Sequence, residues 1–250
     1  MTGKKNKKIV ATIECRMTSS RLPGKVLMET CGKPMLELQV ERLLKVKAID
    51  EIVLATTINT ADDPIVKLAE RIGVNYYRGS EEDVLNRVLN AAQSCEGDMI
   101  VEITGDCPLV DPQITSQIIQ LYLRNECDYA SNLDPVTFPI GFDSQVFSVE
   151  LLVLADKETD LPTDREHVSW FIRRQPKRFK KLHLPAPQDL EWPELALTLD
   201  EFEDFQLLKT IFEHFYPKRK DFTATDIIRY FRQNPKLLEI NKNVSRTKLD

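Results

Sequence analysis

The sequence predicts an α/β protein with one domain, built on a mainly parallel sheet with helices on both faces. Short apolar, β-branched runs alternate with amphipathic stretches through the first half of the chain. No repeat, low-complexity tract or long linker divides the 250 residues, which are enough for one large core. Strand–helix alternation of this kind implies right-handed crossovers between parallel strands.

The expected elements of the first half follow one another closely. Strands are predicted where apolar and β-branched residues run together, at 8–14, 51–57, 74–79 and 98–104. Helices are predicted where apolar residues recur at helical spacing, at 33–48, 62–73, 80–95 and 111–125. Pro34 suits the first turn of its helix, and Gly73 ends the next one. Ser80 and Asp83, three residues apart, resemble a capping box.

The alternation loosens in the second half. Strands are predicted at 128–132, 142–148, 179–186 and 194–200. Helices are predicted at 163–175, 201–216 and 223–235, the first with a capping box from Thr163 to Glu166. The domain is expected to span residues 9–241, between a basic N-terminal tail at 1–8 and a polar C-terminal tail at 242–250.

Composition excludes several classes of protein. A net charge of −5 argues against nucleic-acid binding. No apolar run approaches the roughly 20 residues of a membrane span, and no signal peptide is evident. The five cysteines are odd in number and lack CxxC spacing, so we expect neither a disulfide frame nor a zinc site, and a cytoplasmic location. Cys107 has no histidine near it in sequence and is expected to pack rather than to act as a nucleophile.

The segment "ECRMTSSRLPGK" directly follows the first strand and carries three cations, Arg16, Arg21 and Lys25. Pro23 and Gly24 bend the backbone sharply, so the loop can aim these cations and backbone N–H groups at one triphosphate. A solvated basic loop is the alternative. The spacing matches neither a Walker A loop nor the glycine pattern of a dinucleotide-binding fold.

Three segments begin where predicted parallel strands end, and they are expected to converge on one mouth: "CRMTSSRLPGK", "YRGSEED" and "TGDCPLVD". Asp106 in the last segment suits Mg²⁺, which takes one or two carboxylates together with nucleotide phosphates. A turn aspartate that caps the next helix is the alternative. Asp111, before Pro112, fits that capping role better and leaves Asp106 free.

Three further residues have a functional and a structural interpretation. Asp200 ends a predicted strand before a helix, and spacing alone favours a helix cap there. His167 lies inside a predicted helix, where a packing or hydrogen-bonding role is the more usual one. Asp143, after Gly141, is either a hydroxyl-binding carboxylate or part of a plain turn.

A set of motifs in order along residues 9–235 resembles one family. They are "RMTSSRLPGKVL", "GKPMLELQVERL", "DEIVLATT", "YRGSEEDVLNR", "ITGDCPLVDP", "FPIGFDSQVFS", "REHVSWFIRR" and "LTLDEFEDFQLL". The chain thereby resembles the cytidylyltransferase-like proteins linked to spore coat polysaccharide biosynthesis, relatives of the CMP-KDO and CMP-sialic acid synthetases. Two departures are visible: Glu14-Cys15 replaces the commoner Gln-Ala, and Phe202 stands where proline is usual.

The resemblance implies a GT-A-like nucleotidyltransferase fold. In such enzymes a sugar oxygen attacks the α-phosphate of CTP and gives a CMP-sugar and pyrophosphate. By motif, the catalytic residues are Arg16, Lys25, Asp106 and Asp200, the last two as ligands of Mg²⁺. The implied nucleotide contacts are Arg16, Ser20, Arg21, Lys25, Arg78, Ser80 and Asp106, and the implied acceptor contacts are Asp143 and His167. Related synthetases also imply a homodimer, for which the apolar helical segment 205–216 offers surface.

Two other functions remain open at this point. A GT-A glycosyltransferase shares the fold, but its usual Asp-x-Asp triplet is absent from this sequence. A non-catalytic nucleotide-binding protein is the other, against which the intact Arg16, Lys25, Asp106 and Asp200 speak. Nothing in the residues themselves fixes the base or the acceptor, so the choice of CTP rests on the resemblance.

Overall fold

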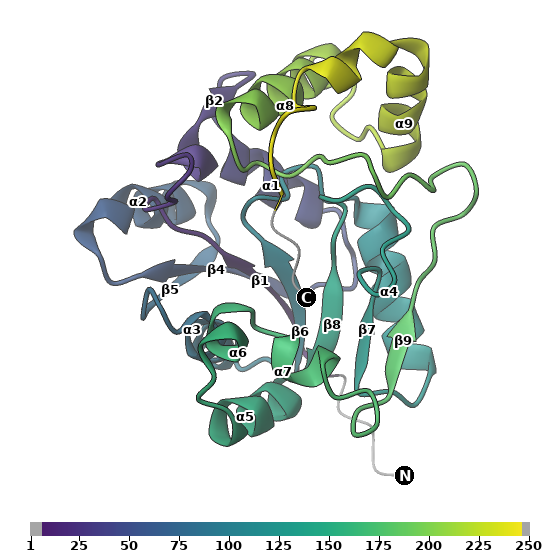
Figure 1. Ribbon diagram of the computed structural model, residues 1–250. Helices are drawn as coiled ribbons and strands as arrows, with labels where there is room; N and C mark the ends of the chain where they lie inside the picture. Colours follow the sequence, from purple (N-terminus) through teal and green to yellow (C-terminus); the bar gives the residue numbers. More distant parts are fainter. Residues whose placement is uncertain (1–6, 247–250) are drawn as a thin grey trace.

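The structure, a computed structural model, describes residues 7–246. The strands of its main sheet are β1 (Ile9–Glu14), β4 (Glu51–Thr57), β5 (Asn75–Gly79), β6 (Met99–Thr104), β7 (Tyr129–Ser131), β8 (Gln145–Ser148) and β9 (Lys181–His183). They are ordered β5-β4-β1-β6-β8-β7-β9 (Figure 1). A separate two-stranded ribbon pairs β2 (Glu29–Thr30) with β3 (Lys33–Pro34).

The strand directions confirm a mixed, mostly parallel sheet. Strand β1 pairs in parallel with β4 and β6, and β4 pairs in parallel with β5. Strand β8 is antiparallel to both β6 and β7, while β9 pairs in parallel with β7. The carboxyl ends of β1, β4, β5 and β6 therefore lie along one edge, where the segments expected to carry ligands begin.

Helices cover both faces of the sheet, as the sequence predicts. The α-helices are α1 (Met35–Leu43), α2 (Asp63–Ile72), α3 (Val84–Ser94), α4 (Pro112–Arg124), α5 (Val149–Glu158), α6 (Pro162–Glu166), α7 (Trp170–Arg173), α8 (Phe202–Phe215) and α9 (Ala224–Gln233). Buried side chains of α1, α2, α4, α8 and α9 share one core cluster, whereas those of α3, α5 and α7 share the other. In Figure 1, α8 and α9 stack together at one end of the molecule.

Most helix boundaries follow the predicted signals. Pro34 stands directly before α1, and Gly73 ends α2 with a φ of 72°. Asp111 caps α4, where its carboxylate accepts from the N–H groups of Gln113 and Ile114. The capping box expected to begin at Ser80 is wrong. Helix α3 begins at Val84 and is capped by Asp83, whose own N–H donates to the Ser80 hydroxyl at 3.1 Å.

The helix predicted at 163–175 is wrong as one element. It divides into α6 and α7, and Thr163 does not cap it. Val168 and Ser169 are buried at the division, and the Ser169 hydroxyl donates to the side chain of Gln145 on β8. This tertiary contact outweighs the local helical preference, and His167 consequently lies just after α6 rather than inside a helix. Helix α5 follows β8 and was not among the predicted elements.

The strand predicted at 194–200 is also wrong, although the segment is extended and buries alternate leucines. It forms only an isolated bridge between Ala196 and Ile140, and its backbone bonds with loops. Leu197 N–H donates to Ile140 O at 2.7 Å, and Leu199 N–H donates to Asp106 O at 2.8 Å. The second bond ties the residue before Asp200 directly to Asp106.

Other expectations concern the surface and the thiols. All five cysteines are free, and Cys107 is buried, where burial raises the pKa of its thiol well above the ordinary value. In residues 7–246, no helix is long and apolar enough to cross a membrane. The apolar face of α8 is mostly buried in the core, and Phe202 at its start is 52% exposed. The expected N-terminal tail lies mostly outside the described residues.

Candidate active site

The loop after β1 folds back on itself beside the edge of the sheet. Gly24 adopts a φ of 73°, and its N–H donates to Met17 O at 2.8 Å. The Met17 N–H donates in turn to the Asp62 carboxylate at 2.7 Å, which fixes the loop against the segment after β4. The closed loop turns Lys25 inward, where its side chain is 13% exposed, and leaves Arg21 outward at 42%.

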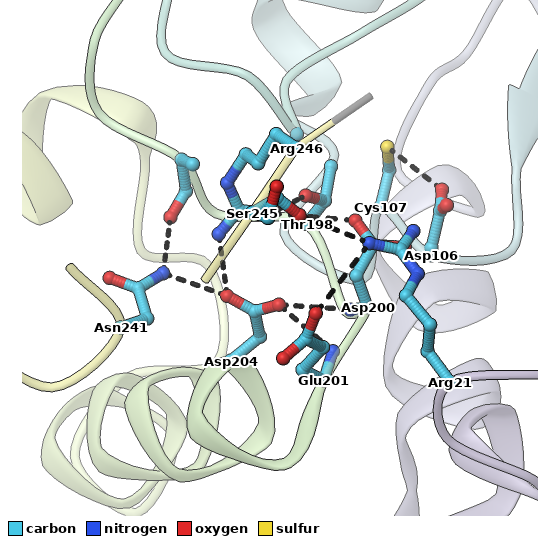
Figure 2. A network of polar contacts seen from close by, with 12 residues as sticks. Arg21, Asp106, Cys107, Thr198, Asp200, Glu201, Asp204, Asn241, Ser245 and Arg246 are labelled. Atoms are coloured by element: carbon cyan, nitrogen blue, oxygen red, sulfur yellow. Dashed lines mark hydrogen bonds and ion pairs between the residues drawn. The ribbon is translucent and has the colours of Figure 1, made fainter. Parts of the chain in front are cut away.

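The ammonium group of Lys25 lies between two carboxylates. Its Nζ is 3.7 Å from Asp106 Oδ2 and 3.2 Å from Asp200 Oδ1. Arg21 Nη2 also donates to Asp200 Oδ1, at 2.8 Å (Figure 2). The structure thus brings together four of the residues singled out in the sequence: Arg21, Lys25, Asp106 and Asp200.

Asp200 is held as a charged group. Burial alone raises the pKa of this carboxyl, but the positive charges of Lys25 and Arg21 outweigh it and keep the pKa below its ordinary value. The carboxylate does not cap α8, because the N-cap is Glu201 and the capping box is formed by Glu201 and Asp204. Its side chain is therefore available for a ligand.

The Asp106–Asp200 pair fits a divalent cation. Two carboxylates that already share one ammonium present their oxygens to a common point, and Mg²⁺ takes one or two protein carboxylates plus phosphate oxygens. No group of three or more His, Cys, Asp or Glu side chains within residues 7–246 is arranged to hold a metal. An ion at Asp106 and Asp200 would thus take its remaining ligands from nucleotide and water.

The other expected nucleotide contacts have partners of their own. Arg16 Nη1 is 3.1 Å from Glu81 Oε1, and the same carboxylate also accepts from Thr18 and Asn59. The Arg78 guanidinium donates to the carbonyl oxygens of Thr57 and Asn59, and its Nη1 is 2.7 Å from Asp63 Oδ1. The remaining two expected contacts, Ser20 and Ser80, are exposed. Glu81, which the sequence reasoning did not single out, joins the segment after β5 to the loop after β1.

The expected acceptor residues lie at different places. Asp143 is partly buried near Asp106 and Arg173, and its removal from water raises the pKa of its carboxyl to about 7. Its Oδ2 is 3.4 Å from the Gly141 N–H. The imidazole of His167 is partly exposed and makes no hydrogen bond or ion pair within the described residues.

A row of polar side chains crosses the sheet face beneath α7, and the sequence reasoning missed it. Strand register aligns five residues on neighbouring strands: Thr12, Glu102, Gln145, Ser131 and His183. We call these five residues the polar row. Facing positions in a sheet point to the same side, so the row forms one polar strip across an otherwise apolar face. The sequence signal is a polar residue at every second position near the end of two strands: Thr12 and Glu14 in β1, and Glu102 and Thr104 in β6.

Within residues 7–246, several buried polar atoms of the polar row and its surroundings have no hydrogen-bond partner. They are Thr12 Oγ1, Glu14 Oε2, Glu102 Oε2, Arg173 Nε and both ring nitrogens of His183. Burial raises the pKa of Glu14 well above its ordinary value, and the nearby charge of Glu102 adds to the shift. Burial likewise raises the pKa of Glu102, which is 3% exposed, to about 8. Unpaired buried polar atoms are costly, and burial accordingly favours the uncharged form of both carboxyls.

The fold, the cation loop and the strand-end carboxylates match what the sequence predicts for a nucleotidyltransferase. A family model described as "Cytidylyltransferase" matches residues 10–243, and the chain belongs to that family. It is 31% identical over 232 residues to the spore coat polysaccharide biosynthesis protein SpsF of Bacillus subtilis, covering 91% of this chain and 95% of that protein.

Two solved structures are similar to this one. A cytidylyltransferase from Leptospira borgpetersenii superposes with a TM-score of 0.88 at 32% identity, covering 97% of this chain and all of the other. The CMP:2-keto-3-deoxy-manno-octonic acid synthetase complexed with CTP has a TM-score of 0.63 at 17% identity, covering 83% and 99%. The second likeness shows the shared fold and confirms the expected nucleotidyltransferase architecture.

Proposed function

We propose that this protein transfers the cytidylyl group of CTP to a hydroxyl of a sugar or sugar acid and releases pyrophosphate, for surface polysaccharide or glycan biosynthesis. The observation that carries the proposal is the Lys25 ammonium held within 4 Å of both Asp106 and Asp200 at the carboxyl edge of the sheet. Membership of the cytidylyltransferase family and the likeness to SpsF support it.

The loop after β1 is suited to bind the triphosphate. Arg16, Arg21 and Lys25 each hold a carboxylate and can exchange it for a phosphate oxygen, at small cost for the half-exposed Arg16 and Arg21. Fixed cations stabilise the charge that spreads over the non-bridging oxygens in phosphoryl transfer. Asp106 and Asp200 would hold Mg²⁺, which when bound neutralises phosphate charge and orients the triphosphate.

The acceptor is proposed to lie beside Asp143 and Arg173, which adjoin the polar row. The guanidinium of Arg173, whose charge acts on both Glu102 and Asp143, suits the carboxylate of a sugar acid. Asp143 lies near both Asp106 and Arg173 and so would face the reacting hydroxyl.

Pyrophosphate release tests the proposal. The protein is incubated with each of the four nucleoside triphosphates, Mg²⁺ and a panel of neutral sugars, sugar acids and phosphorylated sugars. We expect pyrophosphate with CTP and at least one acceptor, and none from Asp106→Asn. Free nucleotide released from a nucleotide-sugar would identify a glycosyltransferase instead, and tight CTP binding without turnover on any acceptor would identify a binding protein.

A homodimer and a cytoplasmic location remain predictions. Exposed Phe202 at the start of α8 offers a small apolar contact, since most of that helix faces the core. Light scattering at micromolar concentration is expected to give twice the chain mass, and a monomer mass would contradict the dimer.

A further inference from the structure

The segment 241–246 returns to the candidate active site and places an arginine beside Asp200 (Figure 2). Arg246 Nη1 is 2.8 Å from Thr198 Oγ1 and 3.4 Å from Asp200 Oδ2, and its Nη2 is 2.6 Å from Asp204 Oδ1. The residue lies beyond 243, where the family match ends, in a stretch for which the sequence predicted only a polar tail.

Asp204 anchors this arginine. Its side chain is fully buried, and within residues 7–246 Arg246 is the cation that forms a salt bridge with it. Asn241 Nδ2 donates to the same Oδ1 at 2.8 Å, while Oδ2 accepts from the N–H groups of Asp200 and Glu201. A buried carboxylate that loses its cation is strongly destabilising, so Arg246 is held in place more firmly than a surface arginine.

The three cations around Asp200 therefore differ in how easily they can leave. Lys25 and Arg21 share Oδ1, and a bound triphosphate offers both of them stronger partners. Their departure frees Oδ1. Arg246 donates to the opposite oxygen, Oδ2, and its bond with buried Asp204 keeps it there. Asp204 also fixes the backbone of Asp200, so the same pair of residues sets both the position and the rotation of this carboxylate.

We propose that Arg246 is a positioning residue that holds Asp200 so that Oδ1 faces the divalent cation of the nucleotide complex. This inference rests on the proposed function, because it assumes a metal–CTP complex at Asp106 and Asp200. The segment at 241–246 is then part of the active site and not a solvated tail.

The test is the gain in CTP affinity that Mn²⁺ provides, measured by calorimetric titration without any acceptor. In the wild type we expect CTP to bind more tightly with Mn²⁺ than without it. In Arg246→Ala most of this gain should be lost, about tenfold for one charge-assisted contact. CTP affinity without metal should change by less than about twofold, because Arg21 and Lys25 are intact. Lys242→Ala, which removes an exposed cation of the same segment, should behave like the wild type.

Two further measurements separate positioning from folding. Thermal unfolding shows whether Arg246→Ala remains folded, and millimolar guanidinium should restore part of its Mn²⁺-dependent gain. Should that variant not fold, Arg246→Lys decides: the charge stays beside Asp204, but one ammonium cannot bridge Thr198, Asp200 and Asp204, so the gain should fall several-fold.

Three results would overturn the proposal. A folded Arg246→Ala or Arg246→Lys with an unchanged Mn²⁺-dependent gain would make Arg246 purely structural. A larger gain in Arg246→Ala would show that the segment competes with the metal. If Mn²⁺ does not increase the CTP affinity of the wild type, no metal is bound with the nucleotide and Arg246 cannot position Asp200 for it. If the gain exists and depends on Arg246 but no acceptor yields pyrophosphate, the positioning role is supported and only the proposed reaction fails.

Discussion

The carboxyl edge of the sheet and the polar row differ in whether their charged and polar groups have partners. At the edge, each cation of the loop after β1 has a carboxylate partner: Arg16 with Glu81, and Arg21 and Lys25 with Asp200. In the polar row and beside it, Glu14, Glu102 and His183 keep buried polar atoms that have no partner among residues 7–246. Asp143 lies between the two regions, because the charges of Asp106 and Arg173 both act on its carboxyl.

This difference indicates which of the two regions can exchange a protein partner for a charged ligand. Paired charges can exchange one charged partner for another, at least cost for the half-exposed Arg16 and Arg21, which suits a triphosphate that arrives and leaves. The buried carboxyls of the polar row and beside it lack such a partner, and burial favours their protonated form, so this region is not suited to exchange one ion for another. Each prediction below alters one region and leaves the other intact.

The largest effect is expected at the two carboxylates. Asp106→Asn and Asp200→Asn should each reduce turnover by at least about 100-fold, a scale typical of losing a transition-state electrostatic contact. Because the pair acts as a unit, the double variant should lose little more than either single one. Steady-state pyrophosphate release measures this. Glu201→Gln, beside Asp200 at the helix cap, is the matched control. A near-normal rate in Asp200→Asn would remove that residue from the site.

Lys25→Ala is expected to weaken CTP binding by about 1.5–3 kcal/mol, the scale of a charge-assisted hydrogen bond. The physical reason is that the Lys25 ammonium lies within 4 Å of both carboxylates and hence beside the phosphates of a bound metal–CTP complex. Isothermal titration gives the affinity. Lys33→Ala, a lysine paired with Glu37 and Glu41 instead, should bind CTP normally. Equal affinities for Lys25→Ala and wild type would mean that the loop is merely solvated.

Glu102→Gln is expected to change how stability depends on pH. The pKa of Glu102 is about 8 in the folded state and 4.5 ordinarily, so the folded protein keeps a proton that the unfolded chain loses. Wild-type stability contributed by this group therefore falls as pH rises from about 4.5 to 8. The variant lacks this group and therefore this decrease. Between pH 4.5 and pH 8, the free energy of unfolding of Glu102→Gln minus that of the wild type should rise by at least about 1 kcal/mol.

Urea unfolding at several pH values measures that change. The control is Glu29→Gln, which alters an exposed carboxylate outside the seven-stranded sheet. Parallel curves for wild type and Glu102→Gln would show that Glu102 is already charged in the folded protein and that the polar row is not desolvated.

The smallest effect is expected at Arg16, whose pairing with Glu81 is half-exposed. Arg16→Ala should weaken CTP binding by up to about 1 kcal/mol, the range of an exposed ion pair. Competition with a fluorescent nucleotide can resolve a change of this size. Arg71→Ala removes another exposed arginine, paired with Glu37, and should leave CTP affinity unchanged. An unchanged CTP affinity in Arg16→Ala would show that Arg16 keeps Glu81 as its partner and does not contact the triphosphate.

How far the sequence predicts the structure depends on the range of the contacts involved. Local signals place the helices and most strands, since Pro34, Gly73 and Asp111 act within a turn of their own position. Elements decided by distant partners were missed. The segment 194–200 has strand-like alternation but no neighbouring strand, and the helix at 163–175 is interrupted where Ser169 bonds with Gln145.

The same distinction holds within the site. The loop cations and strand-end carboxylates were visible as motifs, because each stands at the end of an apolar run. The polar row arises only when strand register aligns Glu102 with Gln145, and Arg246 reaches Asp200 across 46 positions of the chain. Neither spacing within a window nor composition contains such long-range information.

The central claim is that Asp106 and Asp200 hold one divalent cation on the triphosphate of CTP. A crystal of the protein with CTP and Mn²⁺, examined by anomalous scattering, tests it most directly. The account predicts one strong peak bonded to an oxygen of each carboxylate and to phosphate oxygens, with Lys25 moved onto the triphosphate. A peak bonded to neither carboxylate, with Lys25 still between Asp106 and Asp200 while CTP is bound, would contradict it.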